Sequence, residues 1–582
     1  MKKVYSAILV IFISCAIILM SCGTDIDSVA KKTQNADIGG KEGNNVTMIA
    51  VNQIGYSTNG PKNAMFIGEG SKFEVIDKES GKTVYTGAIG DYKDDVSSGD
   101  KVGIGDFSKL TIPGTYYIIA GGDTRSLEFT IADKPYNDVK KALLKAFYYQ
   151  RCGMSLDKDY AGEWGHGACH VGDGYLYDEQ DEHINVTGGW HDAGDYGKYV
   201  VPAAKTVADL MLAYEFSPNA FAESVNTPES NDNVPDVLNE VRYELEWMLK
   251  MQDVKSGGVY HKVATLNFPG FIMPEDDKDK RYINAISATA TADFAAAMAM
   301  AYRIYKPIDI SFANKALDAA KKAWIWLQAN PNASSFKNPP GVNSGEYGDS
   351  NDRDERFWAA AELYSATGEQ MYDAYIKANY QDASFSKVSF GWSDVGGYGT
   401  ISYLGLPKDK RDETVYGYLK SQFISGADKL LGIWQNDGYK VALTPNDYYW
   451  GSNGEVMNRS MFLIMANSIS PNDDYIEAAY DQLNYILGRN ALNQCYITGY
   501  GTKPVMHPHH RPSEADGIEA PVPGMLSGGP NSGRQDAVAE NKIAEGTPPA
   551  KCYIDDVGSY STNEIAIYWN SPAVFVAAYF DR

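Results

Sequence analysis

Two aspartates stand three positions apart in the stretch GGWHDAGDYGKY, which runs from Gly188 to Tyr199. Glycines at this density disfavour a regular helix or strand and favour a shaped loop. Carboxylates held in a loop can serve as acid or base groups, or they can simply face water, because aspartate is a common turn residue. The choice between these two interpretations of Asp192 and Asp195 depends on the rest of the chain.

A third carboxyl group stands near the C-terminal end, in KCYIDDVGSYSTNEIAIYWNSP. Glu564 directly precedes the apolar run from Ile565 to Tyr568. Apolar surroundings disfavour the ionised form of a carboxyl group, so we expect a raised pKa for Glu564, which suits a general acid. The alternative is an ordinary acid in the first turn of a helix.

A proline-rich segment, YGTKPVMHPHHRP, brings several basic side chains together. His507, His509, His510 and Arg511 supply hydrogen-bond donors that can bind sugar hydroxyls or position an acid. The alternative interpretation is a surface turn.

Two cysteines and two histidines with zinc-ligand chemistry lie in one short segment of the chain: Cys152, Cys169, His170 and His191. Thiolates and imidazoles in this number predict a closed tetrahedral zinc site with a structural role, because no coordination position remains open. The alternative is a Cys152–Cys169 disulfide, which an exported location permits. Because His191 immediately precedes Asp192, a metal here would hold the loop that carries the aspartates.

An acidic segment, GEYGDSNDRDERFWAAAELY, contains Asp349, Asp352, Asp354 and Glu355. Carboxylate oxygens at this density can hold calcium, but acids in the first turn of a helix serve equally well to complement its dipole. Cys495 and Cys552 are expected to be buried thiols or a second disulfide.

Composition and charge limit the class of partner. The chain has 582 residues and a net charge of -23, so a polyanion such as nucleic acid would be repelled. A neutral or cationic substrate is expected. The 41 tyrosines and 10 tryptophans are compatible with a surface that stacks on sugar rings.

The N-terminus indicates export. Two lysines, an apolar run and the ending Leu19-Met20-Ser21-Cys22 predict a signal peptide over residues 1–22, and this ending resembles a bacterial lipobox in which Cys22 is lipidated. An ordinary signal peptide and an uncleaved anchor are the alternatives. Residues 23–46 are polar and predict a flexible tether. We therefore expect a lipoprotein of the bacterial cell envelope, held by its lipid at the outer membrane or cell surface, or facing the periplasm.

The remaining chain divides into a strand-rich and a helix-rich part. Residues 47–132 show short strands and turns, including the hairpin KFEVIDKESGKTVYTG, and predict a small antiparallel β-sandwich. Residues 138–582 show about a dozen stretches with helical periodicity and no regular alternation of strand and helix. This pattern favours a mainly α fold, a toroid or helical repeat, with the site in loops at one end.

These segments together resemble glycoside hydrolase family 9, the inverting cellulases. The block from Tyr553 to Ser571, the block CYITGYGTKPVMHPHHR and the loop GGWHDAGDYGKY are similar to three separate motifs of that family, in the same order. Cys495 departs from the second motif, where a small hydroxyl residue is more usual. VNQIGY, FYYQRCG, GGVYHKV and WGSN are also family-like, so the resemblance extends from Val51 to the end.

The resemblance implies an immunoglobulin-like β-sandwich followed by an (α/α)6 barrel. It implies that Asp195 is the general base, that Asp192 helps to orient the attacking water and that Glu564 is the general acid. Relatives with this N-terminal domain carry the same Cys, Cys-His, His zinc site. Inverting hydrolysis requires the base and acid carboxyls to lie roughly 6.5–9.5 Å apart. The residues expected to contact substrate are His509, Arg511, Tyr260, His261, Trp392, Tyr449 and Trp450, the last five of which fit a scaffold role equally well.

The function expected is endo-hydrolysis of β-1,4-glucan chains of the cellulose type by a monomer. Alternatives with the same machinery are hydrolysis of xyloglucan or mixed-linkage glucan, and exo-action on oligosaccharides. A glucan-binding lipoprotein without catalysis is an alternative of another class, which loss of either acid would favour; both acids are present. A zinc hydrolase is a further alternative, in which removing the metal would stop turnover before it unfolds the protein.

Overall fold

A computed structural model describes residues 45–333 and 335–582. The predicted signal peptide, the lipidation site at Cys22 and all of the predicted tether except its last two residues lie outside the described residues. Among the helices that are described, none is both long and apolar enough to cross a membrane.

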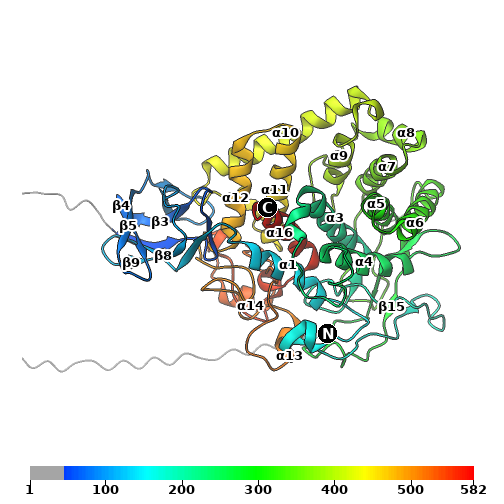
Figure 1. The fold of residues 1–582 in the computed structure, drawn as a ribbon. Coiled ribbons are helices and arrows are strands. Elements are labelled where there is room, and N and C mark those ends of the chain that lie inside the picture. The colour runs from blue at the N-terminus through cyan, green and yellow to red at the C-terminus, as the bar shows by residue number, and fades with distance from the viewer. Residues whose placement is uncertain (1–44, 334) are drawn as a thin grey trace, which may run out of the picture. The chain divides into compact units, whose positions relative to one another are not determined.

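The first part is a sandwich of two mainly antiparallel sheets (Figure 1). One sheet has the order β1 (Asn45–Ala50), β3 (Asn63–Glu69), β7 (Lys101–Asp106), β6 (Lys93–Asp94). The other has the order β2 (Gly55–Ser57), β10 (Phe129–Ala132), β8 (Gly114–Ala120), β4 (Lys72–Asp77), β5 (Thr83–Ala88), with β9 (Thr124–Arg125) paired to β8. In the predicted hairpin β4–β5, Phe73 and Val75 enter the core between the sheets, whereas Val84 is exposed.

The second part contains twelve long helices among the described residues, which pair as six hairpins around a barrel (Figure 1). Six helices form the outer ring: α1 (Asn137–Tyr149), α4 (Asp236–Lys250), α6 (Ile310–Ala329), α8 (Gln370–Asn379), α10 (Glu413–Asn436) and α12 (Asp473–Ile486). Six form the inner ring: α3 (Val200–Phe216), α5 (Ala288–Tyr305), α7 (Arg353–Thr367), α9 (Gly396–Leu404), α11 (Ser452–Ile469) and α16 (Ile567–Phe580). Each inner helix packs against the outer helix that follows it, and α16 packs against α1. The expected (α/α)6 barrel is confirmed.

The sequence of each helix explains its place in the barrel. Helix α5 is buried on every side from Ala288 to Ala301, and its alanines allow neighbouring helices to approach closely. Outer helices such as α6 bury one face, which includes Phe312 and Leu327, and keep charged residues such as Lys315 exposed on the other. Short elements occupy the connecting loops: α2 (Lys158–Ala161), α13 (Arg511–Ala515), α14 (Ala537–Lys542), α15 (Tyr560–Asn563), β11 (Tyr175–Leu176), β12 (Lys198–Tyr199), β13 (Val259–Tyr260), β14 (Lys262–Ala264), β15 (Tyr282–Ile283) and β16 (Ile286–Ser287).

Buried hydrogen bonds join the sandwich to the barrel. The Asn52 amide donates to the side-chain oxygen of Asn484 on α12 at 2.8 Å, and the hydroxyl of Tyr136, which precedes α1, donates to the Gly55 carbonyl on β2 at 3.1 Å. These groups lie in the interior, where breaking a hydrogen bond leaves a costly unpaired polar atom. The sandwich is therefore part of the same packed unit as the barrel.

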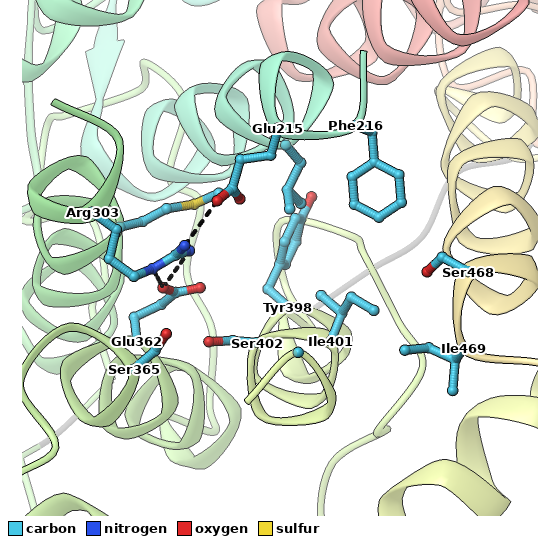
Figure 2. Close-up of a pocket in the computed structure, with 13 residues that line it drawn as sticks. Glu215, Phe216, Arg303, Glu362, Ser365, Tyr398, Ile401, Ser402, Ser468 and Ile469 are labelled. Atoms are coloured by element: carbon cyan, nitrogen blue, oxygen red, sulfur yellow. Dashed lines mark hydrogen bonds and ion pairs between the residues drawn. The ribbon is translucent and has the colours of Figure 1, made fainter. Parts of the chain in front are cut away.

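At the C-terminal ends of the inner helices, an arginine connects three of them (Figure 2). The Arg303 guanidinium on α5 lies 2.9 Å from Glu215 on α3 and 3.0 Å from Glu362 on α7. It borders a cavity of about 380 Å³, in which Figure 2 shows Phe216, Tyr398 and Ile401 on the opposite wall. Because Glu215 and Glu362 both pair with the Arg303 guanidinium, Arg303 positions these three helices relative to one another.

Replacing Arg303 by methionine is expected to lower the free energy of unfolding by ~2 kcal/mol at neutral pH, because it leaves the buried Glu362 carboxylate unpaired. Burial raises the pKa of Glu362, and Arg303 partly opposes this rise. Without the arginine the folded-state pKa rises further, so the penalty applies when the carboxyl is ionised and diminishes as pH falls toward its unfolded value of about 4.3.

Guanidinium denaturation at pH 7.5 and pH 5 measures this difference. Arg242→Met is the matched control, since its ion pair with Glu246 is exposed and is expected to contribute less than about 1 kcal/mol. Equal losses in the two variants, or a loss for Arg303→Met that does not depend on pH, would contradict the assignment.

Candidate active site

A cavity of about 780 Å³ lies at the end of the barrel opposite Arg303, where the inner helices begin. The loops that precede α3, α7, α9, α11 and α16 each contribute to its wall. Its lining comprises Asp192, Ala193, Asp195, Tyr199, Phe268, Gly345, Glu346, Tyr347, Trp392, Trp450, His509, Arg511, Tyr560, Glu564, Ala566, Tyr568 and Trp569. The positive ends of the helix dipoles therefore face this space and favour an ionised carboxylate there.

Asp192 and Asp195 lie in the wall of this cavity, on the loop before α3. The Asp195 carboxylate accepts the Gly197 backbone N–H at 2.9 Å, and Asp192 accepts the Tyr347 hydroxyl at 2.5 Å. The second carboxyl oxygen of Asp192 has no hydrogen-bond partner among the described residues. This oxygen therefore lacks the hydrogen bond that a buried acceptor normally has.

Glu564 lies across the same cavity, between the short helix α15 and the start of α16. Burial raises the pKa of the Glu564 carboxyl well above its usual range, and the negative charge of Asp195 raises it further. Burial also raises the pKa of the Asp192 carboxyl well above its usual range. Arg511 and Trp450 oppose the shift of Glu564 only in part. The Glu564 carboxyl is accordingly held in its protonated form, as expected for a group that donates a proton.

Backbone hydrogen bonds join the three segments that carry these groups. The N–H of Ile567 donates to the Asp192 carbonyl at 2.9 Å, and that of His509 donates to the Asn563 carbonyl at 2.9 Å. Gly194 lies so close to the His509 carbonyl that a Cβ atom would approach its oxygen to 2.0 Å. Only glycine permits this contact, which explains one glycine of the opening motif.

Gln150 is a positioning residue that the sequence analysis did not identify. Its side-chain amide donates to the backbone carbonyls of His191, at 3.2 Å, and Ala193, at 2.9 Å. Its carbonyl oxygen accepts a hydrogen bond from His510 at 3.1 Å. Gln150 therefore connects the aspartate loop to the histidine segment. The motif FYYQRCG contains it, but nothing in one sequence separates it from its neighbours.

Two of the basic residues predicted to contact substrate, His509 and Arg511, line the cavity. The His509 ring bonds the Val557 carbonyl at 2.6 Å, and burial lowers the pKa of this histidine. Arg511 donates to the carbonyl of Gly194 at 2.8 Å and to that of Pro269 at 2.9 Å. His510 is buried and bonds Gln150 and Ser513, so it belongs to the scaffold.

Aromatic side chains form much of the wall. Trp392 and Trp450 line it, as predicted, together with Tyr199, Phe268, Tyr347, Tyr560, Tyr568 and Trp569, which the sequence analysis did not select. Tyr347 adopts a left-handed backbone conformation with φ of 46°, which is strained for a bulky residue and places its hydroxyl on Asp192. Tyr347 is next to Glu346 in an otherwise acidic segment, so no periodic pattern signals it.

Three predicted contact residues do not line the cavity. His261 is buried, stacks on Phe336 and bonds Ser287 and the Glu346 carbonyl through its two ring nitrogens, so none remains for a sugar. Tyr260 packs against the core beside β13. Tyr449 is exposed next to Trp450, but only the tryptophan enters the wall.

The predicted zinc ligands come together behind the aspartate loop. Ligand atoms of Cys152, Cys169, His170 and His191 all lie within 4.8 Å of one another, and the side chains are largely buried. His170 also donates through its other ring nitrogen to Asp277 at 3.3 Å, an arrangement typical of metal-bound histidine. No disulfide forms between Cys152 and Cys169 or between Cys495 and Cys552, which are buried thiols in the described part of the chain. This set can hold a metal ion.

The acidic segment before α7 is arranged differently from the prediction. Asp352 pairs with Arg356 at 2.8 Å, which removes it from a shared cation site. Asp354 accepts the backbone N–H of Val395. The Glu355 carboxylate is buried, and neither of its oxygens has a hydrogen-bond partner among the described residues. Within the described ranges, only the cysteine–histidine set brings three or more candidate ligand atoms as close as 4.8 Å.

Comparison with known proteins agrees with this site. The model of glycosyl hydrolase family 9 matches residues 136–577, and that of a cellulase N-terminal ig-like domain matches residues 44–125. The chain is 40% identical to a cellodextrinase of Butyrivibrio fibrisolvens over 90% of its length and 98% of the relative. It is 40% identical to endoglucanase D of Acetivibrio thermocellus, over 95% and 85% of the two chains. It is 36% identical to a xyloglucan-specific endo-beta-1,4-glucanase of Bacteroides ovatus, over 92% and 93%.

Solved structures show the same likeness. A thermostable endoglucanase from Alicyclobacillus acidocaldarius superposes with a TM-score of 0.87 at 39% identity, over 92% of this chain and 99% of that one. A Zn-binding triple mutant of the family 9 endoglucanase J30 superposes with a TM-score of 0.86 at 36% identity, over 90% and 99%. The paired acids, the barrel that holds them and the extent of the match lead to one conclusion: this chain belongs to glycosyl hydrolase family 9.

Proposed function

We propose that this protein is an inverting endo-β-1,4-glucanase that hydrolyses β-glucan chains of the cellulose type. The observation that carries the proposal is the placement of Asp195 and Glu564 in one cavity in opposite environments. Asp195 accepts a hydrogen bond from a backbone N–H, whereas burial and nearby negative charge raise the pKa of Glu564 and favour its protonated form. The aromatic wall provides flat apolar surfaces for sugar rings.

The two carboxyl groups then divide the reaction between them. Water attacks the anomeric carbon while Asp195 accepts its proton, and Asp192 helps to orient the water. As the bond between the anomeric carbon and the glycosidic oxygen breaks, Glu564 donates its proton to that oxygen, which leaves on the second sugar. His509, Arg511, Trp392 and Trp450 bind substrate beside the cleavage point.

A second candidate within the same chemistry is hydrolysis of short oligosaccharides. The 40% identity to a cellodextrinase supports it, because that relative is matched over 98% of its length. Cleavage of xyloglucan is a further candidate, supported by the Bacteroides ovatus relative. All three share the acid pair, so the loops around the cavity decide among them.

We also propose that the cysteine–histidine set binds zinc. Two thiolates and two imidazoles provide the ligands that zinc prefers, and the Zn-binding triple mutant of the J30 endoglucanase, which has the same fold, supports the assignment. Bound zinc would hold the aspartate loop in shape through His191, without contacting the substrate. Calcium binding by the acidic segment before α7 stays a proposal, supported by the buried Glu355 oxygens and one Asp349 oxygen, which lack partners among the described residues. An ion there would have to draw the carboxyl groups together, because their ligand atoms do not gather within 4.8 Å of one another.

Attachment to a bacterial envelope through a lipid on Cys22 stays a proposal that the N-terminal sequence alone supports. A soluble or amorphous glucan close to the cell surface is the substrate that such a tether suits. We expect the enzyme to act as a monomer.

Glu564→Gln and Asp195→Asn are each expected to lower kcat on carboxymethylcellulose, barley glucan or xyloglucan by about 10²–10⁴-fold, because each variant lacks one proton-transfer group. The Glu564→Gln variant should denature at the same guanidinium concentration as the wild type, or at a higher one, since a buried carboxyl with a raised pKa costs stability when ionised. Release of reducing ends and the denaturation midpoint test both points. Wild type and Glu564→Gln behaving alike on every glucan would refute the role of Glu564.

The pH dependence should follow the protonation of Glu564. Its pKa is raised well above the usual range, so the active protonated form persists to a higher pH than in a free glutamate and is lost as pH rises through the folded-state pKa. A dinitrophenyl β-cellobioside needs no proton on its leaving group. On this substrate Glu564→Gln should retain activity without the alkaline limb of the kcat/KM profile, whereas Asp195→Asn should remain inactive. If both variants, or neither of them, hydrolysed this substrate, the assignment of Glu564 as the acid and Asp195 as the base would be overturned.

Elemental analysis of the purified protein is expected to find one zinc per chain, and Cys152→Ser should lose it. Removing zinc with a chelator should abolish activity and lower the unfolding temperature together, because the metal supports the loop and performs no chemistry. Loss of turnover while the unfolding temperature stays constant would favour the zinc-hydrolase alternative. The same measurement counts calcium, which Glu355→Gln is expected to reduce.

A further inference from the structure

The most exposed aromatic side chains of the described residues all gather at one place. Five aromatic residues have large exposed fractions, namely Phe268, Phe271, Tyr449, Trp450 and Tyr560. Each belongs to a segment that borders the catalytic cavity. Exposed phenylalanine is unfavourable in water, so its concentration beside a cavity indicates a ligand-binding surface.

These rings form a continuous rim. The ring centroids of Trp450 and Tyr560 lie 5.3 Å apart, and those of Tyr560 and His509 lie 5.8 Å apart. Phe271 then meets the His509 ring edge to face at 5.3 Å. The Arg511 guanidinium lies 5.7 Å from the Phe268 ring and 5.8 Å from the Phe271 ring. The rim therefore extends from the catalytic acid's side of the cavity to the tip of a separate loop.

That loop is the long connection between β14 and β15, residues 265–281. Its tip exposes Phe268 and Phe271, with exposed fractions of 48% and 41%. Neither ring is needed to fill the core, since both lie outside the buried clusters. Without anchoring contacts, a loop tip with two exposed phenylalanines would fold onto other apolar surface of the protein. Its exposed position therefore requires specific contacts.

Hydrogen bonds to the backbone hold the tip in place. Arg511 donates to the Pro269 carbonyl at 2.9 Å, and the Tyr196 hydroxyl donates to the Ile272 carbonyl at 2.5 Å. Both partners belong to the segments that carry the catalytic groups. The tip is thus fixed relative to the cleavage point, which reduces the entropy that a ligand would lose on binding there.

We propose that Phe268 and Phe271 form a sugar-binding platform that stacks on a glucosyl unit away from the scissile bond and so sets the preference for chain length. The proposal rests on the proposed glucanase function and extends it. Phe268 supplies the part that lines the cavity, and Phe271 continues it beyond His509. Phenyl rings carry no hydrogen-bonding group, so the platform recognises the apolar CH face of the pyranose ring.

The test compares wild type with Phe268→Ala, Phe271→Ala and the double variant on cellobiose through cellohexaose. For the longest chains kcat/KM should fall about tenfold, mainly through KM, whereas for the shortest hydrolysed chain it should not change. The bonds cleaved in end-labelled cellopentaose should also shift, because a chain gripped less firmly at one end binds in other registers. Phe268→Tyr, which keeps an aromatic ring at this position, should show the same pattern as the wild type.

Val254→Ala, which changes a fully exposed apolar side chain elsewhere, is the matched control and should behave as wild type. An equal loss at every chain length would show that the rings only support Arg511 and would overturn the proposal, as would variants that match wild type throughout. If wild-type protein hydrolyses no β-glucan, the proposed function fails instead. The denaturation midpoint of each variant confirms that the comparison is made between folded proteins.

Discussion

The proposed mechanism requires two carboxyl groups in opposite protonation states to share one cavity, and much of the structure serves this constraint. Like charges in a confined space disfavour double ionisation, so proximity to Asp195 itself raises the pKa of Glu564. The inner helices begin at this cavity, and their N-terminal ends favour an ionised carboxylate among the groups that line it. Separation of the two roles therefore arises from the environment, since Asp and Glu have similar intrinsic acidities.

The barrel makes this arrangement possible because all of its inner helices run in the same direction. Each outer helix is followed by an inner helix, and the connection that precedes the inner helix always lies at the same end. Residues far apart in the chain, such as Asp192, Tyr347 and Glu564, consequently meet around one space. The opposite end carries the ion pairs of Arg303, so the helix ends that lack catalytic loops are tied together by charge (Figure 2).

Several supports converge on the aspartate loop. The cysteine–histidine cluster lies behind it, Gln150 bonds its backbone, and Tyr347 bonds the Asp192 carboxylate. Small displacements of catalytic groups cost large factors in rate, so this redundancy is a physical requirement of positioning. Tyr196, in the aspartate loop, and Arg511 also hold the loop that carries Phe268 and Phe271. The proposed sugar-binding platform is therefore fixed relative to the acid pair.

The sequence by itself determined the features that local chemistry encodes: the helical and strand-rich parts, the acids of the loop motif, Glu564 before its apolar run and the cluster of two cysteines and two histidines. Residue type and spacing suffice for these. Only the tertiary structure decided that Trp450 enters the cavity wall while its neighbour Tyr449 does not, that His261 is buried scaffold and that Asp352 pairs with Arg356. Tyr347, Gln150 and Phe268 were likewise found only there. Which way a loop side chain points depends on contacts with segments hundreds of residues away, and no local pattern in the sequence carries that information.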